Sequence, residues 1–178
     1  MRWAEMVAGQ PKLGEIARER LLGPGVVLVG TQRRDGTARV SGVEPLVMEG
    51  DLWLSMMNSL KVLDLRRDPR LLVRSVLTKP AGEMEILLRG TARLELAEPV
   101  QARYAEAAAA TLGWRPVVGQ FTLFRVEIED VSYIGFDPDT GAQHVARWPA
   151  GVEYVRSTIT PTHYGPRQAV SRLLVRPQ

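Results

Sequence analysis

The chain has 178 residues, of which 45% are hydrophobic, so it is long enough to bury a core without disulfide or metal support. It has no cysteine, which excludes a disulfide framework and a thiolate metal site. The formal net charge is only +3 and no basic run exceeds two residues, so the charge does not favour nucleic-acid binding.

The hydropathy pattern indicates neither a membrane segment nor a secretory leader. No apolar run reaches the roughly 18 residues that a membrane span requires. Glu5 and Glu15 interrupt the N-terminal segment, which is therefore a poor signal peptide. We expect a cytoplasmic protein without membrane contact, whose residues 1–178 form one domain.

The first part of the chain is predicted to form a short helix and two β-hairpins. Apolar residues at helical spacing place the helix at 11–22, and Gly23-Pro24-Gly25 ends it. Asp35-Gly36 separates two β-rich runs, which is a strong hairpin signal, and Glu49-Gly50-Asp51 forms the second turn. The four strands of these hairpins are expected at 26–32, 37–44, 46–48 and 52–56.

Two further helices are predicted downstream. The first spans 59–67, with Ser59 as a suitable N-cap, and it ends before Pro69 because the residue preceding a proline disfavours helix. The second has Pro99 in its first turn, contains a run of strong helix formers and stops at Gly113.

The remaining strands are expected at 71–77, 84–96, 121–134 and 142–148. A turn at 79–82 joins the first two of them, Gly90 is expected to kink the second, and the tail beyond Pro149 is expected to be mostly irregular. Successive hairpins with few, short helices predict a mainly β fold with flanking helices (α+β). Its antiparallel sheet should close into a barrel, because closure removes exposed strand edges.

The segment from Arg39 to Lys61 carries the side chains best suited to bind an anion. A helix N-terminus offers free N–H groups and a partial positive charge, and Ser59 and Lys61 stand at such an N-terminus. The helix dipole disfavours a lysine in the first turn unless an anion is bound there. Arg39 from a nearby strand and the Ser55 hydroxyl could contact the same anion. The alternative remains open that Ser59 is a plain N-cap and Arg39 a solvated strand residue.

The order of these motifs resembles the core of the pyridoxamine 5'-phosphate oxidase-like superfamily. The resemblance rests on the segments VLVGTQRRDGTARVSGVEPLVMEGDLWLSMMNSLKVLDLRRDPRLLVRS, LLRGTARLE, FTLFRVEIEDVSYIG and VARWPAG, and it covers roughly residues 17–151. It implies a six-stranded antiparallel split β-barrel of the Greek-key, FMN-binding type, with residues 152–178 as a C-terminal extension. It also implies a homodimer that holds FMN, or a deazaflavin coenzyme (F-420), in clefts between the subunits.

The resemblance further implies which residues contact the cofactor. These are Arg39, Val40, Ser41, Gly42, Val43, Ser55, Ser59, Lys61, Glu85, Arg147 and Trp148. The arginine at 39, the two serines at 55 and 59 and the lysine would contact the phosphate, while the backbone of 40–43 would line the flavin ring. Glu85 stands about where the oxidases often have a flavin-contacting glutamine. Arg147 or Trp148 would reach in from the other subunit, although Trp148 could equally be a core or surface aromatic.

Two departures from the family pattern change the expected function. Leu60 occupies the position of a frequent arginine, which removes one phosphate ligand. The segment QHVARW at 143–148 does not match the Arg-x-His-x-Arg-like segment with which the true oxidases bind pyridoxamine phosphate, so oxidation of that substrate is not expected.

The sequence therefore predicts an FMN-dependent oxidoreductase that acts on an unidentified small organic substrate. No catalytic residue is identified, and a proton could come from solvent or from Tyr133. The alternatives are a deazaflavin-dependent reductase, a non-enzymatic flavin- or haem-binding protein and, least favoured, a nucleic-acid-binding barrel. Arg66, Arg67 and Arg70 could form a cationic track for the acidic tail of a deazaflavin. No metal site is expected, because His144 and His163 lack partners at metal-ligand spacing.

Overall fold

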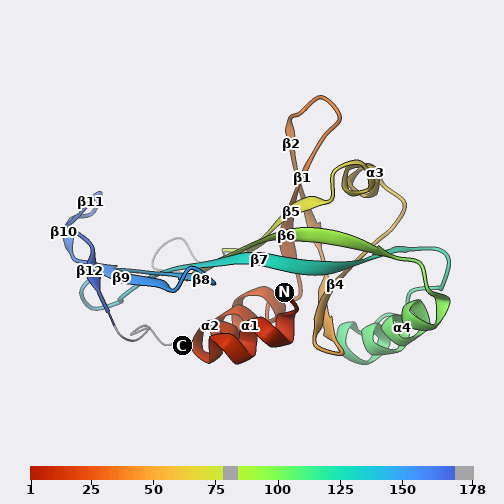
Figure 1. The fold of residues 1–178 in the computed structure, drawn as a ribbon, viewed down its shortest axis with the longest axis horizontal. Coiled ribbons are helices and arrows are strands. Elements are labelled where there is room, and N and C mark those ends of the chain that lie inside the picture. The colour runs from red at the N-terminus through yellow and green to blue at the C-terminus, as the bar shows by residue number, and fades with distance from the viewer. Residues whose placement is uncertain (78–83, 171–178) are drawn as a thin grey trace.

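The computed structural model describes residues 1–77 and 84–170, and β7 (Thr122–Phe136) runs through its centre (Figure 1). β7 has 15 residues, and inward and outward side chains alternate along most of it. One of its edges pairs with β6 (Glu85–Glu95). The other edge pairs first with β4 (Asp51–Met56) and then with β8 (Gln143–Trp148). A single long strand therefore joins two parts of the sheet.

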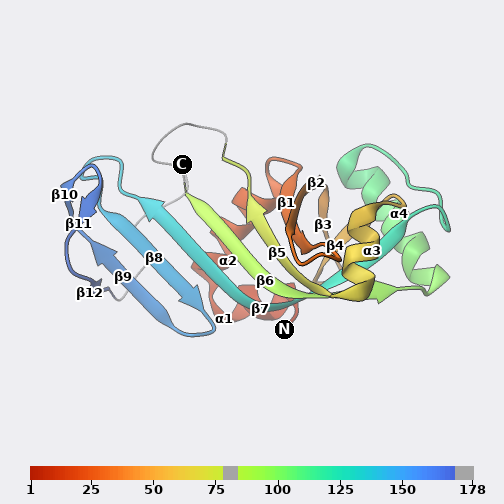
Figure 2. The same ribbon diagram turned by 90° about the horizontal axis from the view of Figure 1, so that it is seen from above.

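Within the described residues, ten strands form one antiparallel sheet in the order β12-β9-β8-β7-β6-β5-β1-β2, with β3 and β4 attached to β7 through β4. The further strands are β1 (Val27–Gln32), β2 (Ala38–Val43), β3 (Pro45–Met48), β5 (Arg70–Ser75), β9 (Val152–Arg156) and β12 (Gln168–Ala169). β10 (Thr158–Thr160) and β11 (His163–Tyr164) pair separately. Figure 2 shows β8 and β9 extending beyond β6 and β7 as an arm.

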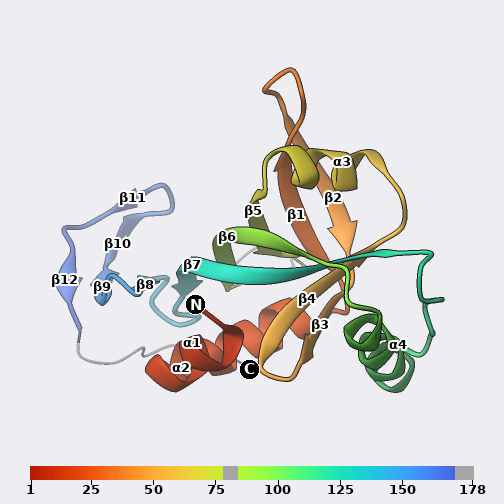
Figure 3. The same cartoon turned by 45° about the vertical axis from the view of Figure 1, so that its right-hand side comes forward.

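The helices bury two apolar clusters against this sheet. α1 (Trp3–Gly9), α2 (Pro11–Ala17) and the π-helical turn η1 (Arg18–Leu22) lie together under the sheet in Figure 1, and their apolar side chains join the larger cluster. α4 (Glu98–Leu112) packs Tyr104 and Ala108 against Trp53 and Phe121 in the second cluster. α3 (Leu60–Arg67) lies beside the β1–β2 hairpin, away from α4 (Figure 3). No helix in the described ranges is both long and apolar enough to cross a membrane.

The local signals for hairpins and helices are confirmed. The turn at 33–36 closes with Gly36 at φ 85, a left-handed conformation that favours glycine. α4 ends at Gly113, which has φ 77, as its sequence predicts. The first four strands and α3 lie where they are expected, within two residues at each end.

Two expectations about the fold are wrong, one helix was not predicted, and one expected turn lies outside the described residues. The sheet has more than six strands and is not a closed barrel, because its hydrogen-bonded path ends at β2 and β12. The described part of the tail, up to residue 170, is not mostly irregular, since the edge of β8 pairs with β9 and thereby continues the sheet. Residues 3–9 form a helix that the sequence analysis did not predict. The turn expected at 79–82 falls in the part that is not described.

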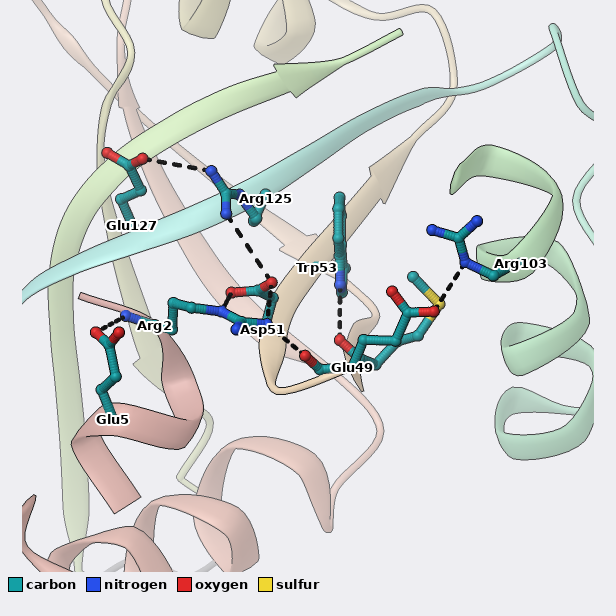
Figure 4. A network of polar contacts seen from close by, with 9 residues as sticks. Arg2, Glu5, Glu49, Asp51, Trp53, Arg103, Arg125 and Glu127 are labelled. Carbon is teal, nitrogen blue, oxygen red and sulfur yellow. Dashed lines mark hydrogen bonds and ion pairs between the residues drawn. The ribbon is translucent and has the colours of Figure 1, made fainter. Parts of the chain in front are cut away.

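A network of charged residues attaches the N-terminus to the β3–β4 turn (Figure 4). Arg2 donates from Nε and Nη2 to the two carboxylate oxygens of Asp51, each at 2.9 Å. Arg2 also donates to the carbonyl of Glu49, whose side chain accepts a bond of 2.8 Å from Arg103 on α4. Arg125 on β7 lies 4.0 Å from Asp51. The turn therefore connects α1, α4 and β7.

The kink expected at Gly90 is confirmed as a β-bulge. Arg89 pairs with Asp130 but Gly90 pairs with Ile128, so β7 contributes one extra residue. A Cβ atom at Gly90 would lie 2.3 Å from the carbonyl oxygen of Glu127. Only glycine therefore fits this approach of β6 to β7.

We predict that Gly90→Ala destabilises the protein by about 1–3 kcal/mol, because the added methyl group must displace backbone rather than a flexible side chain. The measurement is the free energy of urea unfolding. Leu94→Ala is the control on the same strand, since Leu94 is 40% exposed and its truncation should change stability by no more than about 0.5 kcal/mol. Equal stabilities for the two variants would contradict the prediction.

Candidate functional site

An ion pair between β2 and α3 holds the two elements of the predicted anion site together. Arg39 on β2 donates from Nε to Oδ2 of Asp64 at 2.6 Å. The Thr31 hydroxyl on β1 donates to the same oxygen at 3.2 Å. Asp64 is only 4% exposed, and Arg67 on the next turn of α3 lies 3.5 Å from its other oxygen. The carboxylate is therefore surrounded by donors.

The surroundings of Asp64 favour its ionised form. Burial by itself raises the pKa of a carboxyl group, but the hydrogen bonds from Arg39 and Thr31 and the nearby positive charges outweigh it. The pKa of Asp64 consequently lies below its usual value. Arg39 uses Nε in this pair, and its two Nη groups make no hydrogen bond within the described ranges, so they remain available to a ligand.

The N-terminus of α3 carries a buried hydroxyl without a partner. Ser59 occupies the N-cap position with extended φ of −155°, yet its side chain makes no capping hydrogen bond. Its Oγ is buried and has no hydrogen-bond partner among the residues described. Lys61 Nζ lies 3.4 Å from the carbonyl oxygen of Gly42, which places the cation over the backbone of β2. The start of α3 therefore carries an unpaired hydroxyl, a lysine and free helix N–H groups.

The two faces of β2 border different hollows. Arg39, Ser41 and Val43 alternate along the face that is turned toward α3, and Val43 is buried. Val40 and Gly42 lie on the opposite face, where Val40 is 66% exposed. On that face a groove of about 480 Å³ extends over neighbouring strands, lined among others by Gly30, Val40, Leu71, Leu72, Arg89 and Glu129. This groove is mainly apolar at its floor and charged at its rim.

A second hollow, of about 830 Å³, lies between the β1–β2 hairpin and α3. Its lining residues are Arg33, Arg34, Asp35, Arg39, Leu60, Leu63, Asp64 and Arg67. We call this hollow the hairpin cleft. Arg39 is the residue that it shares with the apolar groove.

Ser55 lies on the face of β4 that is turned to α4. It alternates with Leu54 and Met56, which face the larger cluster, and it shares its face with Trp53. Its neighbour there is Tyr104, whose burial raises the pKa of the phenol to about 12, while the Ser55 hydroxyl partly offsets that rise. The structure thus places Ser55 toward the second cluster, whereas Ser59 and Lys61 lie beside β2.

The remaining predicted cofactor residues lie along β6 and β8. Glu85 accepts a bond of 2.8 Å from Arg74, and Arg147 lies 3.4 Å from Asp130. Glu85 and Arg147 both lie on the face of the sheet that is turned away from the larger apolar cluster, which we call the outer face. Trp148 lies on the inner face, where a Cβ atom on Gly9 of α1 would meet its ring at 3.0 Å. Trp148 is partly buried and packs against the larger cluster, while its predicted contact with a cofactor stays a prediction.

The two other residues singled out for chemistry are buried. Tyr133 is fully buried in the larger cluster, and burial strongly raises the pKa of its hydroxyl, so it does not face either hollow. His144 is 3% exposed, and burial lowers the pKa of its imidazole. No cluster of three or more potential ligands among histidine, cysteine and acidic residues occurs in the ranges 1–77 and 84–170.

Asp64 and the arginines of the hairpin turn, Arg33 and Arg34, were not predicted from the sequence as parts of the site. Asp64 could have been noticed, because it stands between Val62 and Leu65 on a short helix and therefore on a buried position. The proximity of Arg33 and Arg34 to α3 could not have been predicted, because it depends on how the hairpin packs against the helix.

No family model and no curated protein matches the chain, but solved structures match its fold. One is described as a putative pyridoxamine 5'-phosphate oxidase from Listeria innocua, with TM-score 0.51, 18% identity, and coverage of 60% of this chain and 86% of that one. An F420 reductase has TM-score 0.52 and 16% identity, covering 64% and 94%. A heme binding protein from Mycobacterium smegmatis has TM-score 0.54 and 18% identity, covering 72% and 56%. At these identities the likeness concerns the fold alone.

We predict that Asp64→Asn destabilises the protein by about 1.5–3 kcal/mol at pH 7, the range for a hydrogen bond to a charged group. The folded-state pKa of Asp64 is depressed, so its stabilisation is fully present above the ordinary value of 3.8 and is lost as the pH falls through the folded-state pKa. Urea unfolding of both proteins should therefore show a gap in stability at pH 7 that narrows in strong acid. Asp139→Asn, in an exposed loop, is the control, and a gap independent of pH would contradict the assignment.

Proposed function

Because the chain has the fold of the pyridoxamine 5'-phosphate oxidase-like superfamily, we propose that it is an FMN-dependent oxidoreductase acting on a small organic substrate. The observation that carries the proposal is the N-terminus of α3, where the buried Ser59 hydroxyl has no partner among the described residues and Lys61 stands beside it. An anion at this point would satisfy the hydroxyl, the lysine and the helix N–H groups together.

The residues present fit FMN in two respects. Ser59, Lys61 and the Nη groups of Arg39 would hold the phosphate. Val40, which is exposed and lines the apolar groove, would contact the ring. When bound, FMN would supply the hydride transfer, and the protein's part is binding, orientation and electrostatics. Leu60 leaves this site with one cation fewer than the family pattern has.

The charges around α3 favour FMN over a deazaflavin coenzyme. A deazaflavin carries an acidic tail that needs an extended cationic track. Arg70 pairs with Asp68 at 2.5 Å, and Arg67 pairs with Asp64 and donates to the carbonyl of Gln32. Two of the three arginines expected to form the track are thus already engaged with protein acceptors.

Haem is the less favoured ligand. One solved structure of this fold is described as a heme binding protein, but the histidines of this chain offer little to an iron atom. Its two histidines are His144, which is buried, and His163, which lies on the separate β10–β11 pair.

We also propose that the protein works as a homodimer. The apolar groove is open on the outer face of the sheet, and Val40 beside it is largely exposed, so a ring lying there would be covered on one side only. Arg147 lies on the same outer face, paired with Asp130 but 44% exposed, so a second subunit could reach it. A partner subunit would complete the enclosure that most ligand sites have.

The first test of the proposed function is FMN binding by the purified protein, followed by absorption spectra and titration. Lys61→Ala should weaken FMN binding by about 1.5–3 kcal/mol, because it removes a charged hydrogen-bond donor without breaking a buried ion pair. Lys12→Ala is the matched control, since Lys12 is an exposed lysine of α2 paired with Glu15. Wild-type affinity in Lys61→Ala would remove the phosphate assignment. A protein that binds a deazaflavin at least tenfold more tightly than FMN would contradict the choice of cofactor.

Light scattering should give twice the chain mass of 19.8 kDa at micromolar concentrations. Val40→Asp places a charge on the exposed face of β2 and should shift the protein toward monomer, because a carboxylate is costly to bury in an interface without a partner. Ile159→Asp, at an equally exposed apolar residue on β10, should leave the mass unchanged. A monomeric wild-type protein would refute the dimer.

A further inference from the structure

The hairpin cleft combines an excess of positive charge with exposed apolar surface. Four guanidinium groups, those of Arg33, Arg34, Arg39 and Arg67, line it together with two carboxylates. Two positive charges are therefore not balanced within the lining. A concave surface of one sign raises the local concentration of ligands of the opposite sign.

Both carboxylates of the cleft accept hydrogen bonds from protein donors. Asp35 accepts bonds from the backbone N–H and the hydroxyl of Thr37, at 3.0 and 2.7 Å, and these bonds hold its pKa below the usual value. Asp64 is buried between Arg39 and Thr31. The two carboxylates offset two of the four positive charges, so the lining keeps an excess of positive charge.

The two arginines of the hairpin turn have side-chain donors that are free to bind a ligand. The Arg33 side chain donates one hydrogen bond within the described residues, from Nη1 to the Thr37 hydroxyl at 3.3 Å. Arg34 is exposed and has no hydrogen bond or ion pair within residues 1–77 and 84–170. Guanidinium groups with free donors bind carboxylates in a bidentate manner, and their planar faces stack on aromatic rings.

The opposite wall of the cleft is apolar. Leu60 and Leu63 lie three residues apart on α3, so their side chains stand on one helix face, and they are 61% and 57% exposed. Single exposed leucines are ordinary, but two of them facing unpaired arginines across a cleft form a surface with an apolar side and a cationic side. The cleft volume of about 830 Å³ lies within the range of small-molecule sites.

We infer that the hairpin cleft binds an aromatic carboxylate, with its ring between the leucines of α3 and the guanidinium planes of the hairpin and its carboxylate on Arg34. This site shares Arg39 with the proposed phosphate site, but neither Ser59 nor Lys61 lines it. It does not rest on the proposed function, since the cleft needs no flavin to carry its charge or its leucines.

The binding test uses the full chain without added flavin and naphthalene-2-carboxylate as the probe, titrated by calorimetry. Naphthalene-2-carboxamide has the ring without the charge, and acetate has the charge without the ring. We expect the naphthoate to bind at least about tenfold more tightly than either, an advantage of the size that one charge-assisted contact gives. The advantage over the carboxamide should shrink as salt screens the arginines. Equal binding of naphthoate and carboxamide would overturn the inference.

Two pairs of variants place the site in the cleft. Arg34→Ser and Leu63→Ser should each weaken naphthoate binding by about fivefold or more, because each removes one side of the cleft. Arg66→Ser and Leu96→Ser, an exposed arginine of the same helix and an exposed leucine elsewhere, should bind as the wild type does. If Arg66→Ser weakened binding as much as Arg34→Ser, or Leu96→Ser as much as Leu63→Ser, the naphthoate would not bind in the hairpin cleft. Displacement of naphthoate by FMN or by a deazaflavin would show that the cleft belongs to the cofactor site, and would also overturn the inference.

Discussion

The pairing of β7 with three strands is the constraint on which the rest of the fold depends. A strand has only two edges, so β4 and β8 must share one edge of β7. The pairing with β4 reaches Val126 of β7, and the pairing with β8 starts at Val131 of β7. Met1 occupies the gap, exchanging backbone hydrogen bonds of 2.7 and 2.9 Å with Ile128. The bulge opposite Gly90 lies at the same point. One half of β7 therefore serves the curved part of the sheet, and the other half serves the arm formed with β8 and β9.

The pair of Arg39 and Asp64 performs the corresponding task for the candidate site. α3 is a short helix with two exposed leucines, so apolar burial alone fixes its position weakly. A carboxylate that is buried and bonded to both β1 and β2 specifies the register of α3 against the hairpin, because any displacement would leave the charge unpaired. This register brings Lys61 to the carbonyl of Gly42.

Local chemistry accounts for the parts of the structure that the sequence predicted. Gly36 and Gly113 mark their turns through backbone conformations that favour glycine, and Gly90 marks the bulge through a contact that excludes any side chain. The strands after residue 151 were missed because their pairing depends on the free edge of β8, which no local pattern reveals. The candidate site was predicted only in part for the same reason. Ser59 and Lys61 follow from a helix start, whereas Asp64 and the hairpin cleft follow from tertiary contacts.

Arg39 connects the two hollows on either side of β2, and its bonding shows how a single residue can serve both structure and binding. Its Nε donates a hydrogen bond to Asp64. Breaking this bond would destabilise the protein, because it would leave a buried carboxylate with one donor fewer. Its Nη groups make no hydrogen bond within the described residues, and Arg39 lines both the apolar groove and the hairpin cleft. A ligand that uses these donors adds to the existing pair instead of replacing it. Binding on either side of β2 would therefore also strengthen the attachment of α3, since the same guanidinium takes part in both.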